Sequence, residues 1–139
     1  MKIVVFGAAR RVGALIDEKV IDLNHGLARS LREKGEAKAD EQALTRLPAR
    51  LLSFIESGAA GLEEARRVID QFAEISPSDD RGEPKVVHNA SEVKLHAPWP
   101  ERRIACVGGN YAAHLAGMWA NRLGKTDVSI EEITEEAKK

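Results

Sequence analysis

The first 23 residues contain three short apolar runs separated by polar turns, and this alternation most limits what the chain can fold into. Ile3 to Phe6 is the first run, Ala14 to Ile16 is the second, and Val20 to Leu23 is the third. Short apolar runs that alternate with turn residues are typical of neighbouring antiparallel strands. The chain is therefore expected to begin with an antiparallel β-meander.

A helical pattern follows the meander. Asn24 is a candidate N-cap, Leu27 and Leu31 fall on one face at helical spacing, and Gly35 is a stop signal. The polar stretch from Glu36 to Gln42 lacks this spacing and is expected to be partly mobile. The pattern predicts a first helix that begins just after the third strand.

Two more helices are expected before residue 76. Pro48 suits the first turn of one helix and Gly58 ends it, while Gly61 to Ile75 forms the other. Apolar residues recur at helical spacing in both segments. The side chains expected to face inward are Leu51, Leu52, Ile55, Leu62, Ala65, Val68, Ile69 and Phe72.

Ser76 to Pro84 is a loop rich in Ser, Pro and Asp, after which strand patterns return at Val86 to His88 and Val93 to Ala97. The predicted fold class is therefore α+β. An antiparallel β-meander and three helices would form a small N-terminal domain over residues 1–90. Residues 91–139 would hold the first strands of a second, β-rich domain that is incomplete.

Composition excludes several classes of partner. The formal net charge is −1 and no basic stripe is present, so we expect no nucleic acid partner. The apolar runs are far too short to cross a membrane, and the N-terminus lacks a signal-peptide pattern.

Cys106 is the single cysteine, and a cytoplasmic protein is the simplest interpretation. Arg10 and Arg11 are interpreted as solvated turn residues.

A strand and turn near the end of the chain carry the candidate chemistry. The apolar run from Ile104 to Val107 ends at two glycines, and Asn110, Tyr111 and His114 follow at once. A neutral imidazole at such a position can accept a proton from water or carbon. On these residues alone, a packing or capping role for the histidine is the better interpretation.

The stretch from Leu95 to His114 resembles the segment that opens the catalytic domain in the fumarylacetoacetate hydrolase family. Its first part matches the L-x-x-P-x-P pattern of that segment, and Ile104 onward matches the I-x-C-V-G-x-N-Y-x-x-H strand and turn. Residues 1–75 are also similar to the small N-terminal domain of the family. The resemblance implies chemistry on 2-oxo or β-diketo acids that depends on a divalent cation.

The resemblance also implies roles for individual residues. His114 would be the general base, and Gly109, Asn110 and Tyr111 would shape the wall of the substrate pocket. Members of the family hold Mg²⁺, or Mn²⁺ or Ca²⁺ in its place, with an E-x-E pair and a later Asp. No such set follows His114 in this chain, so the ligands are expected beyond Lys139.

One position departs from the family pattern. Many members place a glutamate that steers the histidine three residues after it, and here that position is Gly117. Glu131 and Glu132 are candidate substitutes on a closing helix from Ser129 to Glu136. An acidic helix face is more often simply solvated.

The sequence therefore indicates the N-terminal portion of an enzyme similar to fumarylacetoacetate hydrolases. The parent would hydrolyse carbon–carbon bonds of acylpyruvates, as in aromatic catabolism, or isomerise or decarboxylate oxo-diacids. It would act as a homodimer on a small 2-oxo acid, and the 139-residue chain alone would be inactive. The alternative is a non-catalytic interaction module that pairs with another chain.

Overall fold

The computed structural model of this protein describes residues 2–98 together with 117, 118, 120–122, 124, 129 and 131. The chain forms two compact units, Met1–Pro100 and Glu101–Lys139. The first unit joins a five-stranded sheet to four helices, which confirms the expected α+β class. In the second unit, residues 117, 118, 120–122 and 131 are helical, and Ala120 is buried.

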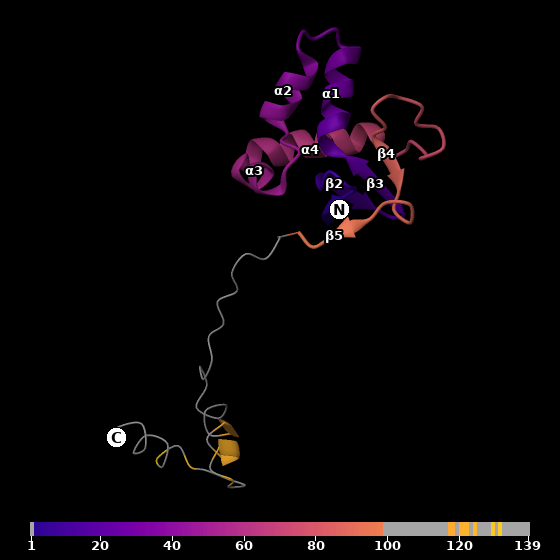
Figure 1. Ribbon diagram of the computed structural model, residues 1–139. Coiled ribbons are helices and arrows are strands. Elements are labelled where there is room, and N and C mark those ends of the chain that lie inside the picture. Colours follow the sequence, from indigo (N-terminus) through magenta and orange to yellow (C-terminus); the bar gives the residue numbers. More distant parts are fainter. Residues whose placement is uncertain are drawn as a thin grey trace. The chain divides into compact units, whose positions relative to one another are not determined.

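The N-terminal meander is present as predicted, and two later strands extend it. The strand order is β4-β3-β2-β1-β5, and each neighbouring pair is antiparallel (Figure 1). The first unit extends past residue 90, because β5 pairs with β1 at Val5 and Phe6. A catalytic domain beginning at residue 91 stays a prediction. The strands are β1 (Lys2–Phe6), β2 (Arg11–Ile16), β3 (Lys19–Asp22), β4 (Val87–Asn89) and β5 (Leu95–His96).

The sheet is strongly curled. In a flat sheet β1 and β4 would lie roughly 14 Å apart, since two strands stand between them and neighbouring strands are about 4.8 Å apart. The ring centroids of Phe6 on β1 and His88 on β4 are nevertheless 5.3 Å apart. Gly13 on β2 makes this approach feasible, because a Cβ there would lie 2.9 Å from both Phe6 Cε1 and Val20 Cγ1.

The helices gather on one side of the sheet (Figure 1), and there is one more than the three expected. The helix over 39–46 was missed, and it includes the second half of the polar stretch at 36–42, whose expected mobility stays a prediction. Only the small side chains of Ala39 and Ala43 are buried in this helix, which leaves little apolar periodicity to detect. The helices are α1 (Leu23–Glu33), α2 (Ala39–Arg46), α3 (Leu51–Glu56) and α4 (Gly58–Phe72).

The cap of α1 is Asp22, and the prediction of Asn24 was wrong. The Asp22 carboxylate accepts a hydrogen bond from the backbone N–H of His25, which is three residues further on. Asn24 lies inside the first turn, where its side chain donates to the carbonyl oxygen of Leu47 at 2.9 Å. The helix therefore begins directly where β3 ends.

The main core lies between the sheet and the helices. As predicted, Leu27 and Leu31 of α1 are buried in it, and so are Val68 and Phe72 of α4. For α3 the prediction was wrong for Leu52 and Ile55, which are at least half exposed, while Phe54 is buried. Leu51, also expected inside, is partly buried and packs against the core. Leu62 of α4, also expected inside, is exposed.

The described residues contain no helix that is long and apolar enough to cross a membrane.

Candidate functional site

Most of the predicted site residues lie outside the described part of the chain. These are His114, Gly109, Asn110, Tyr111 and Glu132, so their roles stay predictions. Glu131 is described and is helical and exposed. Gly117 is also helical and exposed, and a Cβ at this position would meet no atom within 4 Å.

Within the first unit, polar side chains converge most strongly where β3 passes into α1. We call this cluster the α1 junction. It combines a buried carboxylate with a guanidinium, an amide and two imidazoles from β2, β3, α1 and β4. Its members are Arg11, Asp22, Asn24, His25 and His88.

The Asp22 carboxylate organises the α1 junction. Arg11 donates to it through Nε at 2.5 Å and through Nη2 at 3.0 Å, and Nη2 also reaches the Asn24 side-chain oxygen at 3.0 Å. The His25 backbone N–H donates to the same carboxylate at 2.9 Å. The interpretation of Arg11 as a solvated turn residue was wrong, because Arg11 begins β2, its side chain is 22% exposed, and its guanidinium binds the Asp22 side chain, which is 2% exposed.

The ring of His25 contacts the same carboxylate more loosely. Its Nδ1 lies 3.3 Å from the Asp22 oxygen Oδ2. Burial lowers the pKa of His25 below 6.5; Asp22 works against this shift, and Arg11, His88 and Arg32 add to it. At neutral pH the imidazole is therefore uncharged, with one nitrogen available as a proton acceptor.

A second buried carboxylate, Asp80, holds the loop that precedes β4. It accepts hydrogen bonds from the backbone N–H groups of Val86 and Val87, each at 2.7 Å, and from Arg29 Nη1 at 2.6 Å. Arg29 also donates to the carbonyl oxygen of Pro84 at 2.8 Å. Burial raises the pKa of Asp80, but these donors outweigh it and bring the pKa to about 2.

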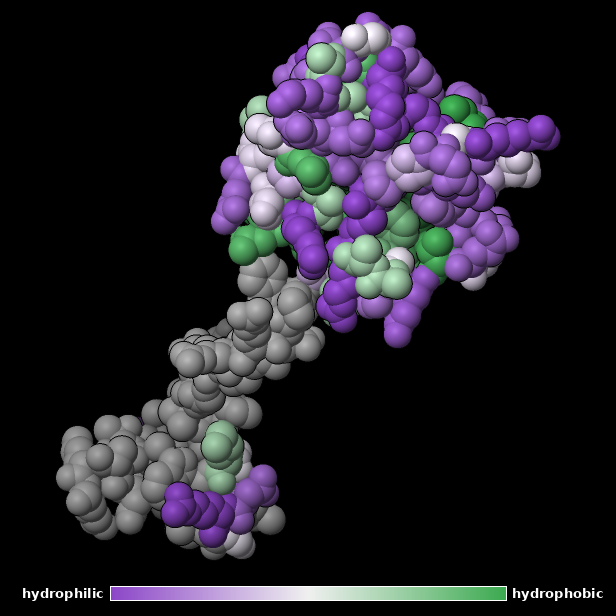
Figure 2. Space-filling view, turned by 45° about the horizontal axis from the view of Figure 1, so that its top comes forward, coloured by the Kyte–Doolittle hydropathy of each residue, from purple (hydrophilic) through white to green (hydrophobic). Residues whose placement is uncertain are grey.

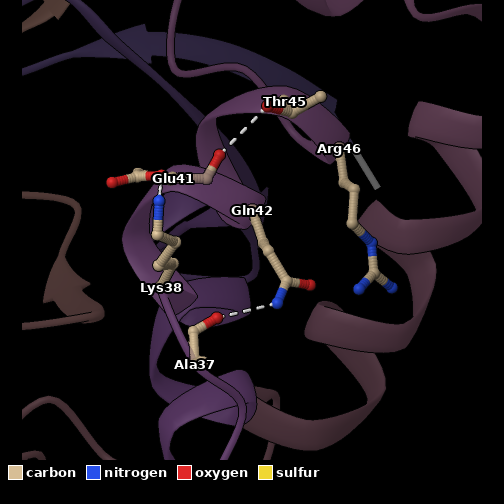
Figure 3. Close-up of a pocket in the computed structure, with 6 residues that line it drawn as sticks. All are labelled: Ala37, Lys38, Glu41, Gln42, Thr45 and Arg46. Atoms are coloured by element: carbon tan, nitrogen blue, oxygen red, sulfur yellow. Dashed lines mark hydrogen bonds and ion pairs between the residues drawn. The ribbon is translucent and has the colours of Figure 1, made fainter.

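The surface hollows among the described residues border α2 and α4. The hollow in Figure 3 has a volume of about 350 Å³ and is lined along α2 by Lys38, Gln42 and Arg46, among others. Its polar side chains bond to groups of the same segment: Gln42 donates to the Ala37 carbonyl oxygen, and Lys38 pairs with Glu41. Arg46 pairs with Glu64 of α4. The lining therefore has the character of a solvated surface.

No group of three His, Cys, Asp or Glu side chains in the described residues could hold a metal ion.

Sequence reasoning missed both buried carboxylates, Asp22 and Asp80. Asp22 ends an apolar run just before a helical pattern, which is a usable N-cap signal. Asp80 stands in a loop of polar residues, and only its tertiary contacts distinguish it from Asp79.

Comparison with known proteins gives one informative relative. The chain is 34% identical over 110 residues to the oxaloacetate tautomerase YisK of Bacillus subtilis (strain 168). The match includes 77% of this chain and 32% of that protein, so the chain spans about a third of its relative's length. No family model matches the chain. The relative belongs to the fumarylacetoacetate hydrolase family and is an enzyme that isomerises an oxo acid, in agreement with the resemblance seen in the sequence.

Proposed function

We propose that this chain is the N-terminal portion of a fumarylacetoacetate hydrolase family enzyme that isomerises a 2-oxo acid. The observation that carries the proposal is the 34% identity to an oxaloacetate tautomerase. The motif from Ile104 to His114 is consistent with it, because it contains a histidine at the position of the family's base. Among the reactions that the resemblance allowed, the relative favours keto–enol isomerisation over carbon–carbon bond hydrolysis.

His114 is proposed as the base of this reaction. In keto–enol isomerisation, a base removes a proton from the carbon beside the carbonyl, and a proton is delivered to the carbonyl oxygen. An imidazole suits this task because its pKa is close to neutral pH. Gly109, Asn110 and Tyr111 would form the wall against which the oxo acid lies.

The divalent cation of the family has no site in the described residues, since no three suitable side chains converge there. The proposal places its ligands outside the described residues. A bound cation would polarise the keto-acid end of the substrate. The 139-residue chain alone is therefore expected to leave the rate of oxaloacetate enolisation at the buffer level, with or without Mg²⁺.

A chimera tests the proposal directly. The matched third of the Bacillus subtilis relative is replaced by this chain, and the tautomerisation of oxaloacetate is followed by its ultraviolet absorbance. We expect an active chimera, and we expect His114→Ala to lower turnover by about a hundredfold or more. His96→Ala is the matched control, because that ring contacts the Gly7 carbonyl oxygen and is assigned no chemical role.

An active chimera whose turnover is unaffected by His114→Ala would refute the assignment of the base. A chimera that folds, as judged by circular dichroism, but has no activity would count against the enzyme proposal as a whole.

An interaction module is the second candidate, and exposed apolar side chains favour it. Leu52 and Ile55 stand three residues apart on α3, with 50% and 58% exposure, and Leu62 of α4 is 40% exposed. Figure 2 shows hydrophobic residues at separate places on a largely hydrophilic face of the first unit. Side chains of this kind can contact another chain, which includes a second copy in the expected homodimer.

Sedimentation of the 139-residue chain tests the module. The module predicts self-association or association with a longer relative, and it predicts that Leu52→Ser combined with Ile55→Ser abolishes this association. Glu56→Gln, an exposed change at the end of the same helix, is the control. A chain that stays monomeric and does not bind the relative would exclude the module.

A further inference from the structure

A small hollow lies where α1, α2 and α4 meet, and positive side chains predominate in its lining. It has a volume of about 80 Å³ and shares Arg46 with the hollow of Figure 3. Its charged side chains are Lys34, Arg46, Arg67 and Glu64, so three positive charges meet one negative charge and the formal charge is +2. The whole chain, in contrast, has a formal net charge of −1. The other lining residues are Leu27, Ser30, Leu31, Val68 and Gln71.

The positive charges of this hollow are only partly compensated. Glu64 Oε1 accepts from Arg46 Nε at 3.1 Å and from Arg46 Nη2, and Arg67 Nη1 lies 3.6 Å from the same oxygen. Arg67 also pairs with Glu63, which does not line this hollow. In the part of the chain that the structure describes, the Lys34 ammonium makes no ion pair. A guanidinium has five N–H donors, so both arginines keep donors for a further acceptor.

The floor of the hollow is apolar and buried. Leu27 and Leu31 of α1 and Val68 of α4 all belong to the main core. An apolar wall of this kind strengthens the electrostatic field of the charges beside it. Arg46 is held in place because its partner Glu64 is only 13% exposed, and Figure 3 shows this arginine extending from α2 toward a neighbouring helix. The hollow is therefore preorganised for a negatively charged group.

We propose that this hollow binds the phosphate group of a small phosphate monoester. A phosphate monoester carries close to two negative charges at neutral pH, which matches the formal charge of the lining. Its oxygens can accept from Lys34, Arg46 and Arg67, which reach the hollow from the ends of α1 and α2 and from α4. A carboxylate offers only two oxygens in one plane and suits three separate donors less well.

A second hollow provides room for the organic part of the ester. It has a volume of about 450 Å³ and shares both arginines and Glu64 with the first hollow. Two hydroxyl-bearing residues and an acid complete its polar lining, Thr45, Ser57 and Glu63. The acid disfavours a second anionic group there, so the ester carries its charge on the phosphate. All of these residues lie in the first unit, and the proposal is independent of the isomerase function proposed above.

NMR titration of the full 139-residue chain at constant pH and ionic strength tests the proposal. The probes are glycerol phosphate and inorganic phosphate. We expect saturable shifts of the Lys34 and Arg67 amides, and we expect the ester to bind several-fold more tightly, because only the ester reaches the second hollow. Lys34→Gln and Arg67→Gln should each weaken binding about tenfold, the usual effect of losing one hydrogen bond to a charged group.

Lys94→Gln is the matched control and should bind as the unaltered chain does, because it removes an exposed positive charge outside both hollows. Shifts that do not saturate with either probe would overturn the proposal, as would equal weakening in Lys94→Gln. Acetate that binds as tightly as inorganic phosphate would refute the choice of phosphate, and equal affinities for the two probes would refute the role of the second hollow. If Arg67→Gln does not fold, Lys34→Gln decides, because that exposed ammonium makes no ion pair among the described residues.

Discussion

The ring of Phe6 on β1 lies 5.3 Å from the ring of His88 on β4, with the two planes inclined by 52°. β2 and β3 lie between these strands in the sheet. The two rings can therefore meet only because the sheet is strongly curled. Phe6 and Val20 are both buried, although neither belongs to the main core between the sheet and the helices. The first unit thus buries side chains on both faces of its sheet.

Gly13→Ala should destabilise the first unit, because the new Cβ would lie 2.9 Å from both Phe6 and Val20. We expect the free energy of unfolding to fall by about 1–3 kcal/mol, the usual effect of overpacking a core. Chemical denaturation with urea measures it. The matched control is Gly117→Ala, because a Cβ there meets no atom within 4 Å; an equal loss in both variants would contradict the prediction.

Asp80→Ala should be more damaging than the position of Asp80 in a loop of polar residues would suggest. The change leaves Arg29 without its carboxylate and leaves the backbone N–H groups of Val86 and Val87 without an acceptor. Removing one partner of a buried ion pair costs about 3 kcal/mol of unfolding free energy. Asp79→Ala changes an exposed neighbour and should have little effect, so similar losses in the two variants would show that Asp80 is not the organising residue.

The same carboxylate predicts how stability depends on pH. The folded-state pKa of Asp80 is about 2, below the ordinary value of 3.8, so its contribution is complete above the ordinary value and is lost as the pH falls toward 2. The shift corresponds to about 2 kcal/mol. Urea unfolding of the chain and of Asp80→Asn should therefore give curves that converge between pH about 4 and pH about 2. Curves that stay parallel across this range would rule out a low pKa for Asp80.

Gly117→Glu should increase the activity of the active chimera with the Bacillus subtilis relative. The change restores a carboxylate three residues after His114, and the open space around Gly117 can accept the side chain. A carboxylate that orients a catalytic imidazole and stabilises its charged form raises turnover. We expect a several-fold increase in kcat, measured against Gly117→Gln as the uncharged control. Equal rates for the two variants would indicate that another group, such as Glu131 or Glu132, already performs this role.

Local patterns predicted the parts of the fold that depend on near neighbours in the sequence. The three apolar runs form the meander because consecutive strands joined by short turns pair with each other. Leu27 and Leu31 face the core because their spacing matches the helical repeat. For the candidate site, the chemistry-bearing motif and its family could be read from the residues, but its geometry lies outside the described part of the chain.

Other features were decided by contacts between distant parts of the chain. Leu52 and Ile55 have the periodicity of a buried face, yet Phe54 is the side chain that α3 turns toward the core. In the sequence Arg11 has the pattern of a solvated turn residue, but in the structure it pairs with Asp22 of β3. Asp80 has the same local pattern as its neighbour Asp79, but in the structure it pairs with Arg29.

The sequence by itself thus determined the α+β class, the meander, the buried face of α1 and, apart from Leu62, the buried face of α4, because these follow from local propensity and spacing. The tertiary structure alone decided the curl of the sheet, the places of β4 and β5 at its two edges, and the partners of the buried carboxylates. The physical reason is that a buried charge or a sheet edge is satisfied only by groups that folding brings from far along the chain. Local sequence patterns do not predict which distant groups those are.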